Sequence, residues 1–184
     1  MLHLKPENDG VDHINIYSKG LTELGRMLTN FYRYRIDIPE AGSFYSLEGF
    51  WYWLFCNNII AYHQSQGLYF TLDKEILSGI DGLRYQSGFH AKAAGRDLVK
   101  RLPESPWTEP TEEFKVAFVE ALKIKIHTIP GLGQAFIESY PKPLLHYYVY
   151  GRDSARPNIK VPASGEWLCK VLTDYREELV NKRP

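Results

Sequence analysis

The sequence has few cysteines, no net charge and no long apolar run. Each of these shortages argues against one class of protein. The two cysteines, Cys56 and Cys169, lie in apolar helical patterns without the paired spacing of a zinc site, so we expect reduced, buried thiols. Lys plus Arg (22) equal Asp plus Glu (22), which leaves no broad positive field for duplex DNA or an anionic membrane. No run approaches the roughly 20 apolar residues of a membrane span, and the first ten residues lack the apolar core of a signal peptide. We therefore expect a cytoplasmic protein that makes no membrane contact.

Familiar cofactor motifs are also missing. The chain has no glycine-rich loop ending in Lys-Ser/Thr and no Gly-x-Gly-x-x-Gly after a strand. The six histidines are scattered without metal-ligand spacing, and no Gly-x-Ser-x-Gly elbow is present. We expect no cofactor and no metal.

The pattern of apolar residues predicts an α+β protein. The length suits one domain, which we place at 13–184 after a flexible arm at 1–12. Alternating or β-prone runs predict strands at 13–17, 31–38 and 42–45, with a hairpin turn at 39–42, and the aromatic run of 141–152 is strand-like after its prolines. Helical spacing predicts helices at 47–58, 72–78, 89–100, 112–127 and 134–139, and a last one from 164. We expect a turn at 79–82 and a polar loop at 153–162.

The stretch from Gly42 to Cys56 holds the best single candidate for chemistry, Glu48. Ser46 is a good N-cap, which places Glu48 at the second helical position, facing the positive end of the helix. A glutamate in a first turn is ordinary and stabilises its helix, so a purely structural role is the alternative. The functional interpretation depends on the surrounding rings, which suit a flat ligand with a polar edge. These rings belong to Phe44, Tyr45, Phe50, Trp51, Tyr52, Trp53 and Phe55.

Lys125 lies where a helical wheel places apolar residues. Counted from Phe114 at 100° per residue, it falls in the stripe of Phe118 and Ala121. Either its ammonium extends along the surface to water, or it is buried and needs an anionic partner, Glu48 or a ligand phosphate.

Three sets of motifs stand out along the chain. The first is Leu28-Thr-Asn-Phe-Tyr32, after Ile14-Asn-Ile-Tyr-Ser-Lys-Gly20, and the second is Phe44-Tyr-Ser-Leu-Glu-Gly-Phe-Trp-Tyr-Trp53. The third and weaker set is Ala91 to Arg96, Ala121 to Ile126 and Gly165 to Leu172. Together they resemble the NADAR family, the YbiA-like domains associated with NAD and ADP-ribose. The first set is similar to its Leu-Ser-Asn-Phe signature and the second to its Ser/Thr-x-Glu-His-aromatic helix start. The resemblance covers about residues 13–180, and the chain looks most like phage-borne members.

This resemblance implies a compact, mostly helical α+β fold with a small antiparallel sheet and an N-glycosidase activity on ribose phosphates. Some members remove ADP-ribose from guanine in DNA, which counters ADP-ribosylating toxins. Glu48 matches the catalytic glutamate, Asn30 and Phe31 match the signature that lines the site, and Lys125 matches the helix lysine. We expect an ADP-ribose-type nucleotide or ADP-ribosylated nucleic acid as substrate. The remaining ligand-binding candidates are Ser18, Trp51, Trp53, Arg96, Tyr148 and Tyr150.

The sequence departs from the family pattern at two places, and both remove a titrating residue that the family has besides the glutamate. Gly49 replaces the histidine after the glutamate, and Tyr147 to Gly151 replaces an Asp-x-x-Trp-Gly segment. His146, Lys19 and Lys125 are the candidate substitutes, as proton donors or, for a lysine, as an amine that attacks the opened sugar. Two alternatives to an enzyme remain, namely a module that binds ADP-ribose without cleaving it and a protein with only a structural or partner-binding role.

Overall fold

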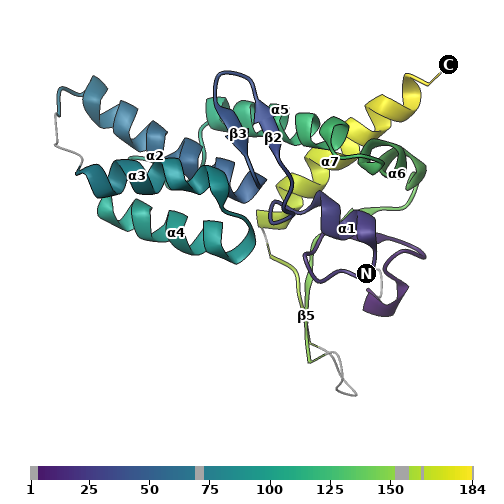
Figure 1. Cartoon of the computed structure of the whole chain (residues 1–184). Coiled ribbons are helices and arrows are strands. Elements are labelled where there is room, and N and C mark those ends of the chain that lie inside the picture. The colour runs from purple at the N-terminus through teal and green to yellow at the C-terminus, as the bar shows by residue number, and fades with distance from the viewer. Residues whose placement is uncertain (1–3, 69–72, 152–157, 163, 184) are drawn as a thin grey trace. The chain divides into compact units, whose positions relative to one another are not determined.

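A computed structural model describes residues 4–68, 73–151, 158–162 and 164–183 (Figure 1). The confirmed class is α+β with helices predominating. The helices are α1 (Glu23–Leu28), α2 (Leu47–Ser65), α3 (Lys74–Gly82), α4 (Gly88–Arg101), α5 (Glu112–Thr128), α6 (Leu132–Glu138) and α7 (Ser164–Asn181), with short 3-10 turns η1 (Pro6–Asn8) and η2 (Leu83–Tyr85). The strands are β1 (Ile14–Asn15), β2 (Ile36–Ile38), β3 (Gly42–Phe44), β4 (Leu144–Leu145), β5 (Tyr148–Tyr150) and β6 (Asn158–Lys160).

The contacts of the chain group into two compact units, which we describe separately. Unit 1 comprises Met1–Thr29 and Ile129–Pro184, and unit 2 comprises Asn30–Thr128. One domain over 13–184 stays a prediction.

Unit 1 is built on two short sheets and three helices. β1 pairs with β4 in parallel, with Ile14 opposite Leu144, and β5 pairs with β6 in antiparallel register. The parallel pair differs from the antiparallel sheet that the sequence predicted. α7 packs on β4, and α6 packs on both α1 and α7. The buried apolar residues of this unit are Ile14, Ile16, Met27, Leu28, Ile129, Leu132, Phe136, Leu144, Tyr147 and Leu172.

The beginning of unit 1 differs from the flexible arm expected at 1–12. Asp9 is buried, and its carboxylate accepts hydrogen bonds from the backbone amides of Asn15 (2.9 Å) and Leu21 (2.7 Å). η1 precedes it. These bonds fix the described part of the segment, because a buried carboxylate is stable only when its oxygens have donors.

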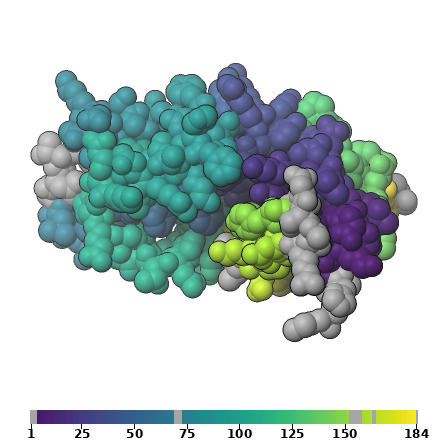
Figure 2. All heavy atoms as spheres, turned by 90° about the horizontal axis from the view of Figure 1, so that it is seen from below, coloured from purple at the N-terminus to yellow at the C-terminus, as the bar shows by residue number. Residues whose placement is uncertain are grey.

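Unit 2 is organised around α2. This helix packs against α3, α4, α5 and η2, and α4 forms part of the outer face that is teal in Figure 2. The predicted hairpin is confirmed, since β2 pairs antiparallel with β3 and Ile36 lies opposite Phe44. β2 in turn packs on α5. One buried cluster at the far end of α2 consists of Cys56, Ile59, Ile76, Ile80, Leu83, Leu98 and Leu102.

Two helices of unit 2 differ from their predicted bounds. α2 continues to Ser65 instead of ending near residue 58, because Cys56 and Ile59 are buried against α3 and α4 and no Pro or Gly interrupts this part. α3 includes the segment 79–82, where a turn was expected. Asp73 caps it by accepting from the Ile76 amide (2.7 Å), and the burial of Ile80 favours another helical turn. The expected helix start at residue 72 lies outside the described residues.

Other predicted elements agree closely with the structure. α5 begins as expected with Thr111, whose hydroxyl accepts from the Phe114 amide at 3.2 Å. α4, α6 and α7 lie within one or two residues of their predicted positions where bounds were given. β6 forms at the end of the expected polar loop, of which residues 153–157 lie outside the described residues. In the described part of the chain, no helix has the length and apolar character that crossing a membrane requires.

Candidate functional site

The first turn of α2 is fixed on two sides. The Ser46 hydroxyl accepts from the Gly49 amide (3.0 Å), which confirms the predicted cap, and donates to the Gln86 carbonyl (2.8 Å). The Glu48 amide donates to the Asn30 carbonyl (2.9 Å). A β-carbon at Gly49 would lie 2.3 Å from the Leu83 carbonyl oxygen, so only glycine fits here. The backbone of η2 therefore leaves no room for a side chain directly after Glu48.

Glu48 is a buried carboxyl group in an electrostatically unusual place. It is 7 % exposed, and burial raises its pKa from 4.5 to about 7. The positive charges of Lys92 and Arg96 on α4 oppose this rise without cancelling it. Among the residues that the structure describes, none donates a hydrogen bond to the carboxyl oxygens. Glu48 thus changes its protonation state near neutral pH, which suits a general acid or base.

Tyr52 lies one turn after Glu48 on the same face of α2. Its ring contacts α4 so closely that a β-carbon at Gly95 would lie 2.0 Å from the ring. Burial and the charge of Glu48 raise the pKa of its hydroxyl, while a hydrogen bond from Arg96 acts in the opposite direction. Arg96 is therefore tied both to Tyr52 and, through its charge, to Glu48.

Asn30 and Phe31 lie next to this group, Asn30 through its carbonyl bond to the Glu48 amide and Phe31 beside Lys92. The Asn30 side-chain oxygen is buried and has no hydrogen-bond partner among the residues that the structure describes. Such an atom costs about 1–3 kcal/mol unless a ligand donates to it. The Phe31 ring packs edge-on against Phe89 (5.0 Å between centroids), and the Lys92 ammonium lies 5.5 Å from its centre. A hydroxyl-bearing ligand would satisfy the oxygen that Asn30 leaves unpaired.

Lys125 is fully buried in α5, so the alternative in which its ammonium reaches water is wrong. Burial lowers the pKa of its amine from 10.5 to about 7. Its nitrogen lies 5.9 Å from the centre of the Tyr32 ring, in the segment that follows Asn30. A large fraction of this amine is neutral at pH 7.

The two tryptophans of the motif occupy different faces of α2. Trp51 packs edge-on against Phe114 (4.5 Å) and Phe118 (4.9 Å) and also borders a surface pocket. Trp53 lies about 140° around the helix from Glu48. It packs against Phe44 (5.4 Å), with the Arg84 guanidinium 4.7 Å from its centre, and does not line that pocket. Its position is that of a packing residue.

The remaining predicted site residues belong to unit 1. Ser18 and Lys19 follow β1 in a turn. His146 is held through both ring nitrogens, one bonded to the Ile16 carbonyl and the other 3.3 Å from the Tyr148 hydroxyl. The carbonyl can only accept, so the facing nitrogen carries the proton and the other is the acceptor in the neutral ring. Tyr150, in β5, lies with its ring 6.4 Å from that of Tyr148.

Tyr147, the first residue of the segment 147–151, has a structural role. The Tyr147 ring is buried, and its hydroxyl lies 2.6 Å from a His13 nitrogen.

Sequence reasoning missed Lys92, and it named Tyr52 only as one of the rings around Glu48 and not among the site residues. Each lies four residues from a residue that was singled out, Lys92 before Arg96 and Tyr52 after Glu48. Residues four apart share a helix face, so applying the wheel used for Lys125 to these two helices would have found both. The close approach of the Tyr52 ring to Gly95 of α4 depends on tertiary packing, which the wheel does not predict.

In the described ranges, no three His, Cys, Asp or Glu side chains gather as metal ligands do. Comparisons with protein-family models, with curated proteins and with solved structures found no match for this chain.

Proposed function

We propose that this protein is an N-glycosidase that releases ADP-ribose from ADP-ribosylated guanine in DNA or from a related ribosylated nucleotide. It would act in the cytoplasm, against an ADP-ribosylating toxin. The observation that carries the proposal is Glu48, a buried carboxyl group with a pKa of about 7 and no hydrogen-bond donor among the described residues. The choice of substrate follows from the resemblance of the motifs around it.

Cleavage of a bond between ribose and a base develops positive charge at the sugar carbon. A carboxylate beside that carbon stabilises the charge, and its effect is large where water is excluded. Glu48 suits this role in its ionised form. A small displacement of the Asn30 side chain would let its buried oxygen accept a hydrogen bond from a ribose hydroxyl, which would satisfy that oxygen and orient the sugar.

The leaving base needs a proton or a positive charge near it. Within unit 2 the candidate is Lys92, because its charge acts more strongly on Glu48 than that of any other described residue. Lys19 and His146 belong to unit 1, and their role as proton donors stays a prediction. Lys125 has no exposed surface, so we assign it to the packing behind the 30–32 segment rather than to attack on the sugar.

A module that binds ADP-ribose without cleaving it is the second candidate. Gly49 favours it, because the backbone of η2 leaves no room for a titrating side chain directly after Glu48. Such a module needs the same pocket and the same hydrogen bond to Asn30. It does not need Glu48 to ionise.

Mass spectrometry can separate the two candidates. The protein is incubated with single-stranded DNA that carries ADP-ribosylated guanine, and free ADP-ribose is followed over time. An enzyme releases ADP-ribose, and the Glu48→Gln variant does not. Intact adduct after long incubation, under conditions where an active member of the NADAR family releases ADP-ribose, would rule out this substrate. Calorimetric binding of ADP-ribose without any product would then favour the binding module.

A further inference from the structure

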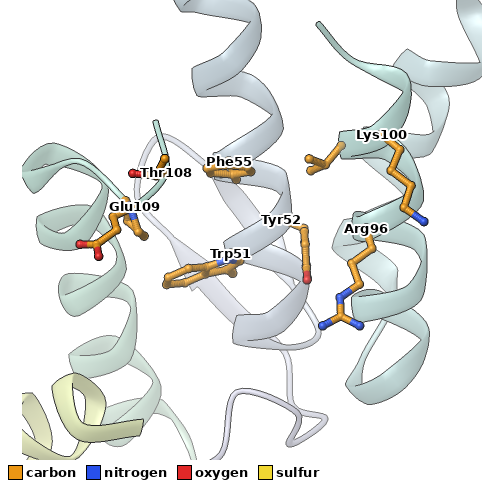
Figure 3. A pocket seen from close by; sticks show the side chains of 9 residues that line it. Trp51, Tyr52, Phe55, Arg96, Lys100, Thr108 and Glu109 are labelled. Atoms are coloured by element: carbon orange, nitrogen blue, oxygen red, sulfur yellow. The ribbon is translucent and has the colours of Figure 1, made fainter. Parts of the chain in front are cut away.

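A surface pocket of about 630 Å³ lies beside the Glu48 group within unit 2 (Figure 3). Its walls come from three segments: α2, α4 and residues 108–110, which precede α5. Ligand pockets for small molecules commonly enclose about 300–1,000 Å³. The size therefore suits an occupant as large as a nucleotide.

Three rings of α2 form the apolar wall. Trp51, Tyr52 and Phe55 project into the space between α4 and the 108–110 segment (Figure 3). Trp51 is held edge-on by two rings of α5, and Tyr52 is held by the close approach of Gly95. Rigid rings of this kind stack a flat base with little loss of side-chain entropy, and stacking is worth about 1–3 kcal/mol per base.

The polar groups at the rim are arranged by charge. Arg96 and Lys100 of α4 lie on one side, and Glu109 lies on the other. The Arg96 guanidinium lies beside the Tyr52 ring, whereas the Lys100 ammonium points away from the rings (Figure 3). An anionic group of a ligand would therefore pair with Arg96, and amino groups of a base would suit the side of Glu109.

The pocket continues along α2 from Glu48. At about 1.5 Å per helical residue, Tyr52 lies about 6 Å and Phe55 about 10 Å farther along the helix axis than Glu48. Arg96 belongs to both places, since it lines the pocket and its charge acts on Glu48. A substrate with its ribose at Glu48 would have its phosphates at Arg96 and its second base against the rings.

We propose that this pocket binds the adenosine diphosphate part of the substrate, with adenine stacked on Trp51 and Phe55 and the diphosphate paired with Arg96. The assignment rests on the proposed function for the place of the ribose at Glu48. Binding of the diphosphate itself does not depend on the chemistry of Glu48, so the pocket assignment and the glycosidase function can fail separately.

Calorimetry with ADP, adenosine and inorganic pyrophosphate tests the pocket in the full-length protein. We expect ADP to bind more tightly than either part alone. Thr108→Trp, which places a large side chain at the exposed rim, should weaken ADP binding at least tenfold. Thr128→Trp, at an exposed site at the end of α5, should leave it unchanged. Arg96→Gln should also weaken it at least tenfold, and Arg101→Gln, which removes the same charge elsewhere on α4, should change it less than twofold.

The outcomes separate the two proposals. The pocket assignment is overturned if ADP binds Thr108→Trp and Arg96→Gln as tightly as it binds the wild type. It is also overturned if ADP does not bind while cleavage proceeds. Pocket-dependent ADP binding that persists in Glu48→Gln, without any cleavage by the wild type, supports the pocket and removes the glycosidase function. If both variants weaken ADP binding and the wild type cleaves the substrate, the pocket assignment and the glycosidase function are both supported.

Discussion

Two carboxyl groups, one in each unit, are buried to the same extent but in opposite chemical settings. Asp9 of unit 1 and Glu48 of unit 2 are each 7 % exposed. Asp9 accepts two backbone hydrogen bonds at 2.9 and 2.7 Å, which tie the start of the chain to residues 15 and 21. Glu48 accepts none from the described residues, and burial raises its pKa to about 7.

Equal burial therefore has different consequences in the two units. A carboxylate that has donors stabilises the fold around it, whereas one without donors costs stability and is retained for another reason. Unit 2 holds two further unusual buried groups: the amine of Lys125, whose pKa burial lowers to about 7, and the side-chain oxygen of Asn30, which has no hydrogen-bond partner among the described residues. We interpret unit 2 as the part of the chain that carries the chemistry.

The largest expected effect concerns activity. Glu48→Gln keeps the shape of the side chain and removes its charge, so cleavage should fall by about 10³-fold while ADP-ribose binding stays nearly unchanged. Release of ADP-ribose measured by mass spectrometry checks this. Glu113→Gln, in the exposed first turn of α5, is the matched control and should keep full activity. Wild-type turnover by Glu48→Gln would remove Glu48 from the mechanism.

Asp9 should matter to stability. Asp9→Ala removes the acceptor of two buried amides, so we expect a loss of about 2–4 kcal/mol in the free energy of unfolding. Asp174→Ala removes an exposed aspartate paired with Lys170 and should cost less than about 1 kcal/mol. Denaturant titration compares them. Equal losses for the two variants would show that the hydrogen bonds to Asp9 contribute little.

Lys125 should make stability depend on pH in the alkaline range. Its amine has a pKa of about 7 in the folded protein and an ordinary value of 10.5 when unfolded, so between these values only the unfolded chain binds the proton. Stability should then rise with pH, by at most about 1.4 kcal/mol per unit.

Lys125→Met should remove this rise, because Met fills the space without a titrating group. Lys123→Met, two residues earlier in a surface ion pair with Glu120, should keep the rise. Unfolding measured at pH 7 to 10 gives the comparison. A wild-type curve that is flat over this range would contradict the buried amine.

The smallest effect concerns the two cations beside Glu48. Lys92 and Arg96 both lower its pKa, Lys92 more strongly, so each Gln variant should move the midpoint of activity to higher pH. The ionised form is the active one in our mechanism, so activity should rise with pH through this midpoint. We expect a shift of less than about one unit, larger for Lys92→Gln. Arg101→Gln should leave the profile in place, and an equal shift there would indicate a general charge effect.

Local rules predicted much of unit 2 and little of how its helices meet. Ser46 and Thr111 were recognised as caps because a hydroxyl before a helix satisfies a free amide, and the structure has both bonds. The helical wheel placed Lys125 among apolar residues. The same rules ended α2 too early, because the burial that extends it comes from α3 and α4, far along the chain.

The site was predicted in the same uneven way. Glu48, Asn30 and Arg96 were found from motifs, and the structure places them near one another through the Asn30 carbonyl bond and the charge of Arg96. Trp53 was chosen for its ring and instead packs among other rings. The sequence could not show that η2 would exclude a side chain at Gly49, since that contact joins residues more than thirty apart.

The most direct test of the central claim is the pKa of Glu48 itself. The carbon NMR signal of its carboxyl group, identified by its absence in Glu48→Gln, can be followed from pH 4 to 9. Burial without hydrogen-bond donors predicts a midpoint at about 7. A midpoint near the ordinary value of 4.5 would contradict the account, because Glu48 would then be an ordinary first-turn carboxylate.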